Sequence, residues 1–108
     1  MRLTVKFTPG ARKDLRSIHE YISSHDSLEK ANYVARKIVE AALSLRELPL
    51  RGAFPPELLA IGKRDYRQVF FKPYRILYRV RGDTIHIAVV ADGRRDMHSL
   101  LARRLLGS

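Results

Sequence analysis

The sequence contains no cysteine and no tryptophan among its 108 residues. The absence of cysteine excludes disulfide bonds, thiolate metal sites and cysteine nucleophiles. No apolar run approaches the roughly 20 residues that a membrane-spanning helix needs, and the N-terminal stretch lacks the apolar segment of a signal peptide. We therefore expect a cytoplasmic protein that does not interact with membranes.

Acidic residues are also scarce, with 11 Asp and Glu against 21 Lys and Arg, which gives a net charge of +10. The imbalance is strongest in residues 63–108, which hold 11 basic and 4 acidic side chains. Such a field attracts nucleic acid or an acidic protein segment. The length and the hydrophobic fraction of 45% are typical of a globular chain, so we expect a single domain over residues 1–108.

The first elements follow from the spacing of apolar residues. Alternating polar and apolar side chains predict a strand over residues 2–7. Thr8 and Pro9 are the residue types of a helix cap and a first helical position. Apolar residues at helical spacing then predict a helix that ends at about Ser23.

A second helix is predicted to follow after a very short connection. Asp26 and Glu29 have the spacing of a capping box, and Ser27 is a competing cap. A long apolar stripe continues until Pro49, which should end the helix. Two helices joined so closely are expected to form an antiparallel hairpin.

The second half of the chain has a different pattern. Residues 51–64 contain two glycines and two prolines among hydrophobic side chains, which predicts an ordered loop without regular structure. From Tyr66 the period changes to two. It predicts three antiparallel strands over residues 66–71, 74–81 and 84–91.

On the final strand we expect Ile85, Ile87 and Val89 to face one side. Residues 94–106 have an apolar stripe at helical spacing and should form a short terminal helix. The predicted fold is therefore α+β, in the order β-α-α-β-β-β with a short C-terminal helix. Its helices should lie on one face of a mostly antiparallel sheet.

Conventional catalytic motifs are not found. There is no P-loop, dinucleotide fingerprint or Gly-x-Ser-x-Gly motif. The histidines lack metal-ligand spacing, and no pair of carboxylates stands out, so we expect no metal and no cofactor. The four histidines are His19, His25, His86 and His98.

The remaining candidates are arginines in the C-terminal half. A guanidinium stays charged in any surroundings and binds phosphate or carboxylate in bidentate geometry. An ordinary solvated sheet face is the alternative interpretation, because several of these residues alternate with apolar ones. The clustered residues are Arg67, Arg75, Arg79, Arg81, Arg94 and Arg95.

These segments resemble the RelE/ParE superfamily of bacterial toxins from type II toxin-antitoxin systems, and they are more similar to the ParE branch. The resemblance implies the superfamily fold and a small toxin that a cognate antitoxin neutralises. It rests on Phe7-Thr8-Pro9-Gly10-Ala11 with Asp14-Leu15 and Ile18, on Leu48-Pro49-x-Arg51-Gly52, on Tyr74-Arg75-Ile76-x-Tyr78-Arg79-Val80, and on Ala91-Asp92-Gly93-Arg94-Arg95-Asp96.

RelE-like members of the superfamily are ribosome-dependent mRNA endonucleases. By resemblance, Arg67, Arg75 and Arg95 occupy basic positions that hold the scissile phosphate. Val69 and Leu101 stand where a lysine and a tyrosine of that site are expected, and neither side chain transfers protons. An endoribonuclease acting on ribosome-bound mRNA would therefore need a substitute, for which His98 is the candidate.

ParE-like members inhibit DNA gyrase without known catalysis, and this is our leading interpretation. The residues expected to bind the target are Arg94, Arg95, Arg103 and Arg104. The expected partner is an acidic cognate antitoxin with an amphipathic segment that folds on binding. A third interpretation is a decayed toxin that retains only antitoxin binding.

Overall fold

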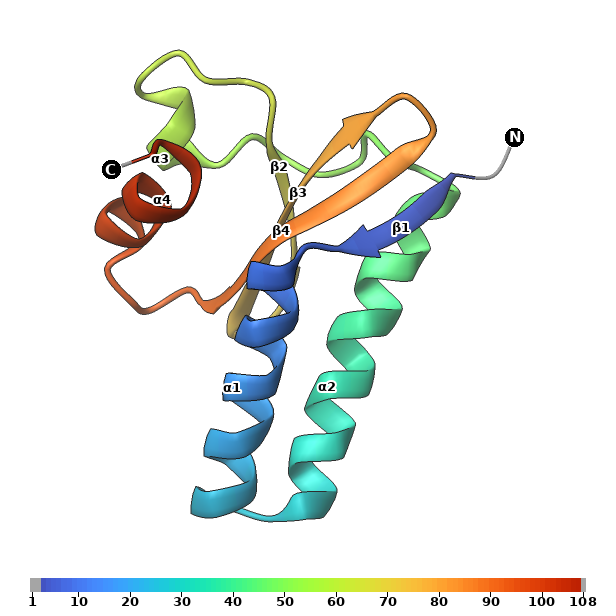
Figure 1. The fold of residues 1–108 in the computed structure, drawn as a ribbon, viewed down its shortest axis with the longest axis vertical. Helices are drawn as coiled ribbons and strands as arrows, with labels where there is room; N and C mark the ends of the chain where they lie inside the picture. Colours follow the sequence, from blue (N-terminus) through green and yellow to red (C-terminus); the bar gives the residue numbers. More distant parts are fainter. Residues whose placement is uncertain (1–2, 108) are drawn as a thin grey trace.

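The computed structural model describes residues 3–107 and has four strands, four α-helices and one 3₁₀ turn in that range. Figure 1 shows a long helical hairpin below a twisted sheet, with two short helices at one end of the sheet. The elements are β1 Thr4–Phe7, α1 Pro9–His25, α2 Leu28–Leu43, η1 Ser44–Arg46, α3 Pro56–Leu59, β2 Arg67–Phe71, β3 Tyr74–Arg81, β4 Thr84–Asp92 and α4 Met97–Leu105.

The strands form one sheet in the order β1-β4-β3-β2. The last three strands pair antiparallel, whereas β1 pairs parallel with β4, and Val5 lies opposite Ile85. The predicted α+β fold with a mostly antiparallel sheet is confirmed. Arg2, with which the predicted first strand begins, lies outside the described residues.

The cap of α1 forms as the sequence predicts. The Thr8 hydroxyl accepts a hydrogen bond from the Ala11 N–H at 3.1 Å, and Pro9 occupies the first turn. The helix continues to His25, two residues beyond the predicted end, until the Asp26 N–H closes its last turn on the Ile22 carbonyl.

Ser27 caps α2, and the capping box predicted for Asp26 is wrong. The Ser27 hydroxyl accepts from the Lys30 N–H at 3.0 Å, because Asp26 is already used in ending α1. The helix also ends at Leu43, earlier than Pro49. A 3₁₀ turn follows, and it places the Leu45 side chain fully inside the core.

The prediction of a loop without regular structure over residues 51–64 is wrong in its middle. Residues 56–59 form the single-turn helix α3, with Pro56 in its first turn, where a proline costs no hydrogen bond. Leu58 of this turn is buried against the sheet side of α4. Tertiary packing of one leucine thus stabilises a helix too short to form alone.

A β-bulge overturns the expectation that Ile85, Ile87 and Val89 face one side. Tyr78 pairs with Ile87, but the preceding Leu77 pairs with Val89, so Ala88 is an extra residue on β4. The extra residue reverses the alternation. Ile87 therefore packs under the helical hairpin, while Val89 packs under α4.

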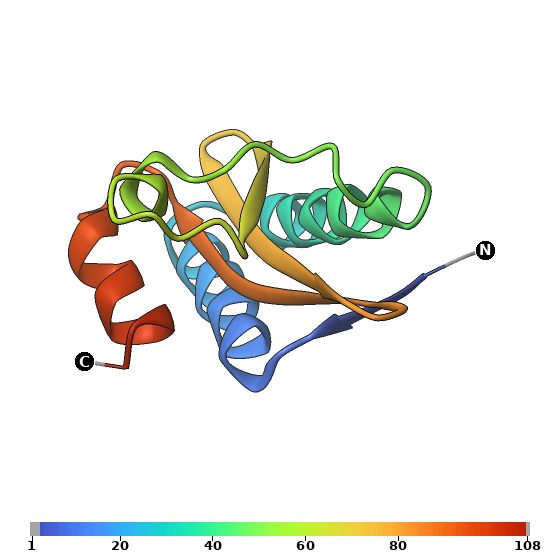
Figure 2. The same ribbon diagram turned by 90° about the horizontal axis from the view of Figure 1, so that it is seen from above.

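The helices cover both faces of the sheet, and not one face as predicted. One core lies under the hairpin and includes Ile38, Ile76 and Tyr78. The other core lies under α3 and α4 and includes Leu77 and Leu101. Figures 1 and 2 place α4 at one end of the molecule and β1 toward the other.

Candidate functional site

Arg75 is buried and paired with a carboxylate. Its guanidinium donates two hydrogen bonds to the Glu57 carboxylate of α3, at 2.7 and 2.8 Å, and a third from Nε to the Gln68 side chain at 2.8 Å. Only 9% of Arg75 is exposed. The hydrogen bond from Arg75 lowers the pKa of Glu57, so the pair is ionised at neutral pH. Its charge is therefore neutralised within the protein.

Arg67 is not brought together with Arg75. It lies opposite Tyr78 on β3, three residues from Arg75, so the two arginines leave opposite faces of the sheet. Arg67 Nη1 donates to the carbonyls of Leu50 and Gly52, at 3.1 and 2.9 Å.

Arg94 and Arg95 lie on the exposed turn between β4 and α4. Arg94 donates from Nε and Nη2 to the Asp92 carboxylate, at 2.9 and 2.6 Å, and these bonds lower the pKa of Asp92. The Arg95 side chain has no hydrogen bond or ion pair with any residue in the described range. Of the predicted arginines on this turn, Arg95 is thus the more available to a partner.

Arg104 holds the terminal helix against the rest of the protein. It donates to both Asp14 carboxylate oxygens of α1, at 2.8 and 3.0 Å, and to the Ala88 carbonyl at 2.9 Å. Asp14 in turn accepts from the Val90 N–H at 2.9 Å. This network satisfies backbone groups of β4 beyond the end of β1. Arg103, one residue earlier, is exposed.

The groups that could transfer protons in a nuclease are not assembled around Arg75. His98 is exposed and makes no hydrogen bond to a described residue. Val69 of β2 lies under the hairpin, whereas Leu101 is a buried residue of α4, so they belong to the two separate cores. Glu57 is the carboxylate beside Arg75, but its lowered pKa makes it a weak base.

Sequence reasoning missed Glu57 and Gln68, which fix Arg75. Glu57 lies in a segment predicted to be a loop, and Gln68 follows Arg67 at the start of a strand as one more polar residue. No local signal distinguishes them, because their shared partner, Arg75, follows Glu57 by 18 residues and Gln68 by 7 residues in the chain. Only the sheet register and α3 bring the three side chains together.

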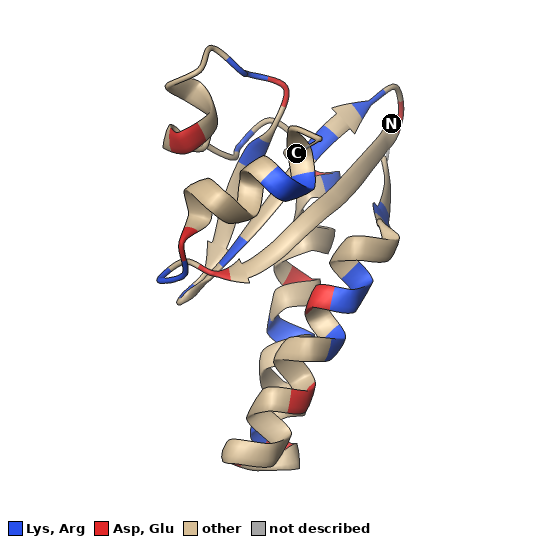
Figure 3. Cartoon of the chain, turned by 60° about the vertical axis from the view of Figure 1, so that its left-hand side comes forward, with Lys and Arg blue, Asp and Glu red and all other residues tan. Residues whose placement is uncertain are grey.

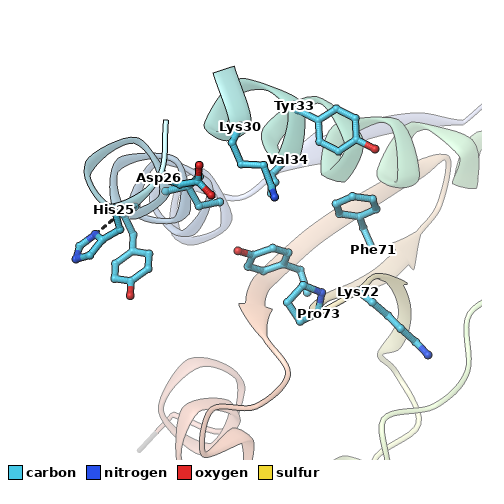
Figure 4. Close-up of a pocket in the computed structure, with 11 residues that line it drawn as sticks. His25, Asp26, Lys30, Tyr33, Val34, Phe71, Lys72 and Pro73 are labelled. Atoms are coloured by element: carbon cyan, nitrogen blue, oxygen red, sulfur yellow. Dashed lines mark hydrogen bonds between the residues drawn. The ribbon is translucent and has the colours of Figure 1, made fainter. Parts of the chain in front are cut away.

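Two adjoining depressions lie beside the helical hairpin. The larger, of about 470 Å³, lies between the end of the hairpin and the turn joining β2 to β3, where the Lys72–Pro73 peptide is cis. In Figure 4 Lys30 reaches toward it from α2, and Tyr33 faces Phe71. The smaller, of about 390 Å³, is bordered by Arg94 and Arg95.

Tyr21, Ile22 and Tyr74 line both depressions, so they form one continuous surface that we call the hairpin groove. Its lining mixes aromatic and aliphatic side chains with polar and charged ones, and the aromatic Tyr21 is 64% exposed. Exposed apolar side chains gathered in this way are typical of a protein interaction site. Both basic and acidic side chains border the groove: Lys30, Lys72, Arg94 and Arg95, and also Asp14, Asp26 and Asp92.

Within residues 3–107 no group of three or more His, Asp or Glu side chains is arranged to hold a metal ion. In the same range, none of the helices is both long and apolar enough to cross a membrane. Figure 3 shows that the hairpin carries both signs of charge, whereas the strands and α4 carry mainly Lys and Arg.

Two similar structures are a chain of the chromosomal ParDE toxin-antitoxin system from P. aeruginosa and one of the RelBE2 toxin-antitoxin complex from Mycobacterium tuberculosis. The first has a TM-score of 0.71 at 25% identity and covers 84% of this chain and 96% of that chain. The second has a TM-score of 0.63 at 26% identity, with 85% and 99% covered.

A comparison of the sequence with curated proteins gives no significant match. The family model described as the ParE toxin of the type II toxin-antitoxin system parDE matches residues 5–97. Because that match spans most of the sequence, and the fold agrees with it, the chain belongs to the ParE family of type II toxins.

Proposed function

We propose that this ParE-family toxin acts by binding DNA gyrase and not by cleaving RNA. The observation that carries the proposal is the Arg75–Glu57 pair, which commits the central arginine of a RelE-like site to an internal carboxylate. A general base is missing beside it within the described residues. A toxin without this chemistry must act by occupying its target.

The surface that we assign to gyrase is the turn with Arg94 and Arg95 together with Arg103 of α4. All three side chains are exposed. Arg104, which was expected to bind the target, supports this surface by fixing α4 to Asp14. Exposed guanidiniums increase the rate and specificity of association with an acidic surface.

A gyrase supercoiling assay tests this proposal. The wild-type toxin should inhibit supercoiling, and the double variant Arg94→Gln, Arg95→Gln should need at least about tenfold more protein for the same inhibition. A matched control is Arg16→Gln, Arg36→Gln, which removes the same charge from the exposed side of the hairpin and should change little.

Lack of inhibition by folded wild-type protein at a large molar excess would contradict the proposal. Position-specific cleavage of mRNA in the ribosomal A site, lost in Arg95→Ala, would establish the RelE-like alternative. Harmless overexpression with intact antitoxin binding would instead identify a decayed toxin.

We also propose that the cognate antitoxin is acidic and that its amphipathic segment lies in the hairpin groove. The similarity to chains of toxin-antitoxin complexes supports a partner of this class. The groove offers aromatic side chains for apolar contacts, while Lys30, Lys72 and Arg95 at its rim suit carboxylates. The net charge of +10 gives a further electrostatic attraction.

Binding of the antitoxin should therefore depend on salt. We expect its affinity to fall by at least about tenfold between 50 and 500 mM NaCl, because exposed ion pairs are screened. In titration calorimetry, Lys30→Gln, Lys72→Gln should flatten this dependence, whereas the control Lys13→Gln, at an exposed residue of α1 that lines neither depression, should not. An affinity that barely changes with salt would mean that apolar burial alone forms the complex.

A further inference from the structure

Three arginines that do not belong to the surfaces above border a small pocket at the edge of the sheet, Arg67 from one face and Arg79 from the other. The pocket has a volume of about 230 Å³ and lies at the edge of β3, which continues past the beginning of β2. We call it the arginine pocket. Its lining residues are Leu50, Arg64, Asp65, Arg67, Tyr78, Arg79 and Val80.

Phe54 orients two of these guanidiniums. The guanidinium carbon of Arg67 lies 4.5 Å from the centre of the Phe54 ring, and that of Arg64 lies 5.8 Å from it. Arg67 is held further by the carbonyls of Leu50 and Gly52, and both of these bonds use Nη1. Arg67 Nε and Nη2 have no hydrogen bond to a described residue, so they are oriented without being neutralised.

Arg79 is oriented in the same way on the other side of the pocket. Its guanidinium lies 5.3 Å from the ring centre of Tyr66, and Nη1 is 3.9 Å from the Asp65 carboxylate. Asp65 also pairs with Lys63 at 3.5 Å. Among the described residues that line the pocket, Asp65 is the only carboxylate. It is shared between two cations at long distances.

This pattern differs from that of three other arginines near the sheet. Arg75, Arg94 and Arg104 each have a bidentate carboxylate partner. Arg64 and Arg67 have aromatic and carbonyl partners instead, which fix direction and leave the charge uncompensated. Cations that are oriented in advance lose little conformational entropy when they bind an anion.

The size of the pocket and its surroundings indicate the ligand. A volume of 230 Å³ is below the roughly 300–1,000 Å³ of typical small-molecule sites, so it suits one anionic group more than a whole cofactor. Outside it, a further cation, Lys6, lies in one row with Arg79 across the sheet, because the strand register places the two on either side of His86. A row of this kind suits a repeated anion.

We propose that the arginine pocket binds a backbone phosphodiester group of a nucleic acid, with further phosphates running along Arg79, His86 and Lys6. Guanidiniums match phosphate oxygens in geometry and charge. Burial raises the pKa of Tyr78, so its hydroxyl stays protonated and donates to the Pro49 carbonyl at 2.7 Å, which fixes the pocket wall. This contact goes beyond the proposed function, since it does not involve the turn with Arg94 and Arg95.

Fluorescence anisotropy with the full-length toxin tests the assignment. The probes are a labelled 20-base-pair DNA duplex and a labelled single-stranded RNA, each titrated at several salt concentrations. For the nucleic acid that binds, the double variant Arg64→Gln, Arg79→Gln should raise Kd at least about tenfold. It should also lower the slope of log Kd against the logarithm of the salt concentration by about one to two, which corresponds to one or two fewer released counterions.

The matched control is Arg16→Gln, Arg36→Gln, which lowers net charge equally on the hairpin and should raise Kd less than about threefold. Circular dichroism checks that each variant is folded. If Arg79→Gln perturbs the packing of Tyr66, the single variant Arg64→Gln, at an exposed position, replaces the double variant.

Equal weakening by both double variants would overturn the proposal, since binding would then follow net charge alone. Absence of binding by either nucleic acid at low salt would also overturn it. If inorganic phosphate bound in the pocket and neither oligonucleotide bound, the site would belong to a small free anion, and the assignment to a nucleic-acid backbone would be refuted. Binding of DNA or of RNA with the expected variant effect supports it and identifies the ligand.

Discussion

A chain truncated after Asp96 is expected to be unfolded at 25 °C. The truncation removes α4, whose Met97, Leu100 and Leu101 are at most 4% exposed. Burying three such side chains contributes about 5–9 kcal/mol, which is comparable to the whole stability of a small domain. It also leaves the Asp14 carboxylate without Arg104.

Circular dichroism and urea titration measure this outcome. A chain that ends at Leu105 is the control, because the next residue, Leu106, is 43% exposed and removing it should change the urea midpoint little. A truncated protein that remained folded but lost toxicity would make α4 a functional element and not a structural one. A remnant that was both folded and toxic would refute the placement of the gyrase surface on this helix.

Glu57→Gln should lower the free energy of unfolding at pH 7 by about 3 kcal/mol. The Glu57 and Arg75 side chains are 14% and 11% exposed, so the substitution leaves a buried guanidinium without its counter-ion. Glu40→Gln is the matched control, because Glu40 forms only exposed pairs with Arg36 and Lys37 on α2 and exposed pairs contribute little.

The loss should depend on pH in a defined direction. The pKa of Glu57 is lowered below its usual value of 4.5, so the unfolded state binds more protons than the folded state as pH falls. The stabilisation is complete above pH 4.5 and is lost as pH falls through the lowered pKa. In urea titrations, the difference in the free energy of unfolding between the wild type and Glu57→Gln should therefore be smaller near pH 3 than at pH 7. A difference that stays constant would contradict the assigned pair.

Local patterns predict that the helical hairpin and the three antiparallel strands form, but not the cap of α2 or the side that Val89 faces. Thr8 caps α1 because its hydroxyl and the Ala11 N–H are three residues apart, and the strand alternation is likewise local. The local pattern does not choose between Asp26 and Ser27 as the cap of α2, because both residue types can cap a helix. The choice is decided by the end of α1, which already uses Asp26.

The arginines were recognised as a group, but the sequence could not assign their partners. Arg75 and Arg104 looked alike as exposed cations, yet one pairs with Glu57 and the other with Asp14, 90 residues away. Whether a guanidinium is neutralised depends on a carboxylate brought close by folding. The arginine pocket is visible only after Phe54 and Tyr66 are placed beside their cations.

The sequence by itself determined the class of fold, the hairpin, the strands and the excess of positive charge, because periodicity, caps and composition are local properties. Tertiary structure alone decided which face of the sheet each element covers and which cations remain free. The physical reason is clearest at Ala88, where one unpaired residue in β4 reverses the side-chain alternation and gives α4 a core of its own. Its carbonyl also accepts from Arg104, so the same bulge helps fix the terminal helix.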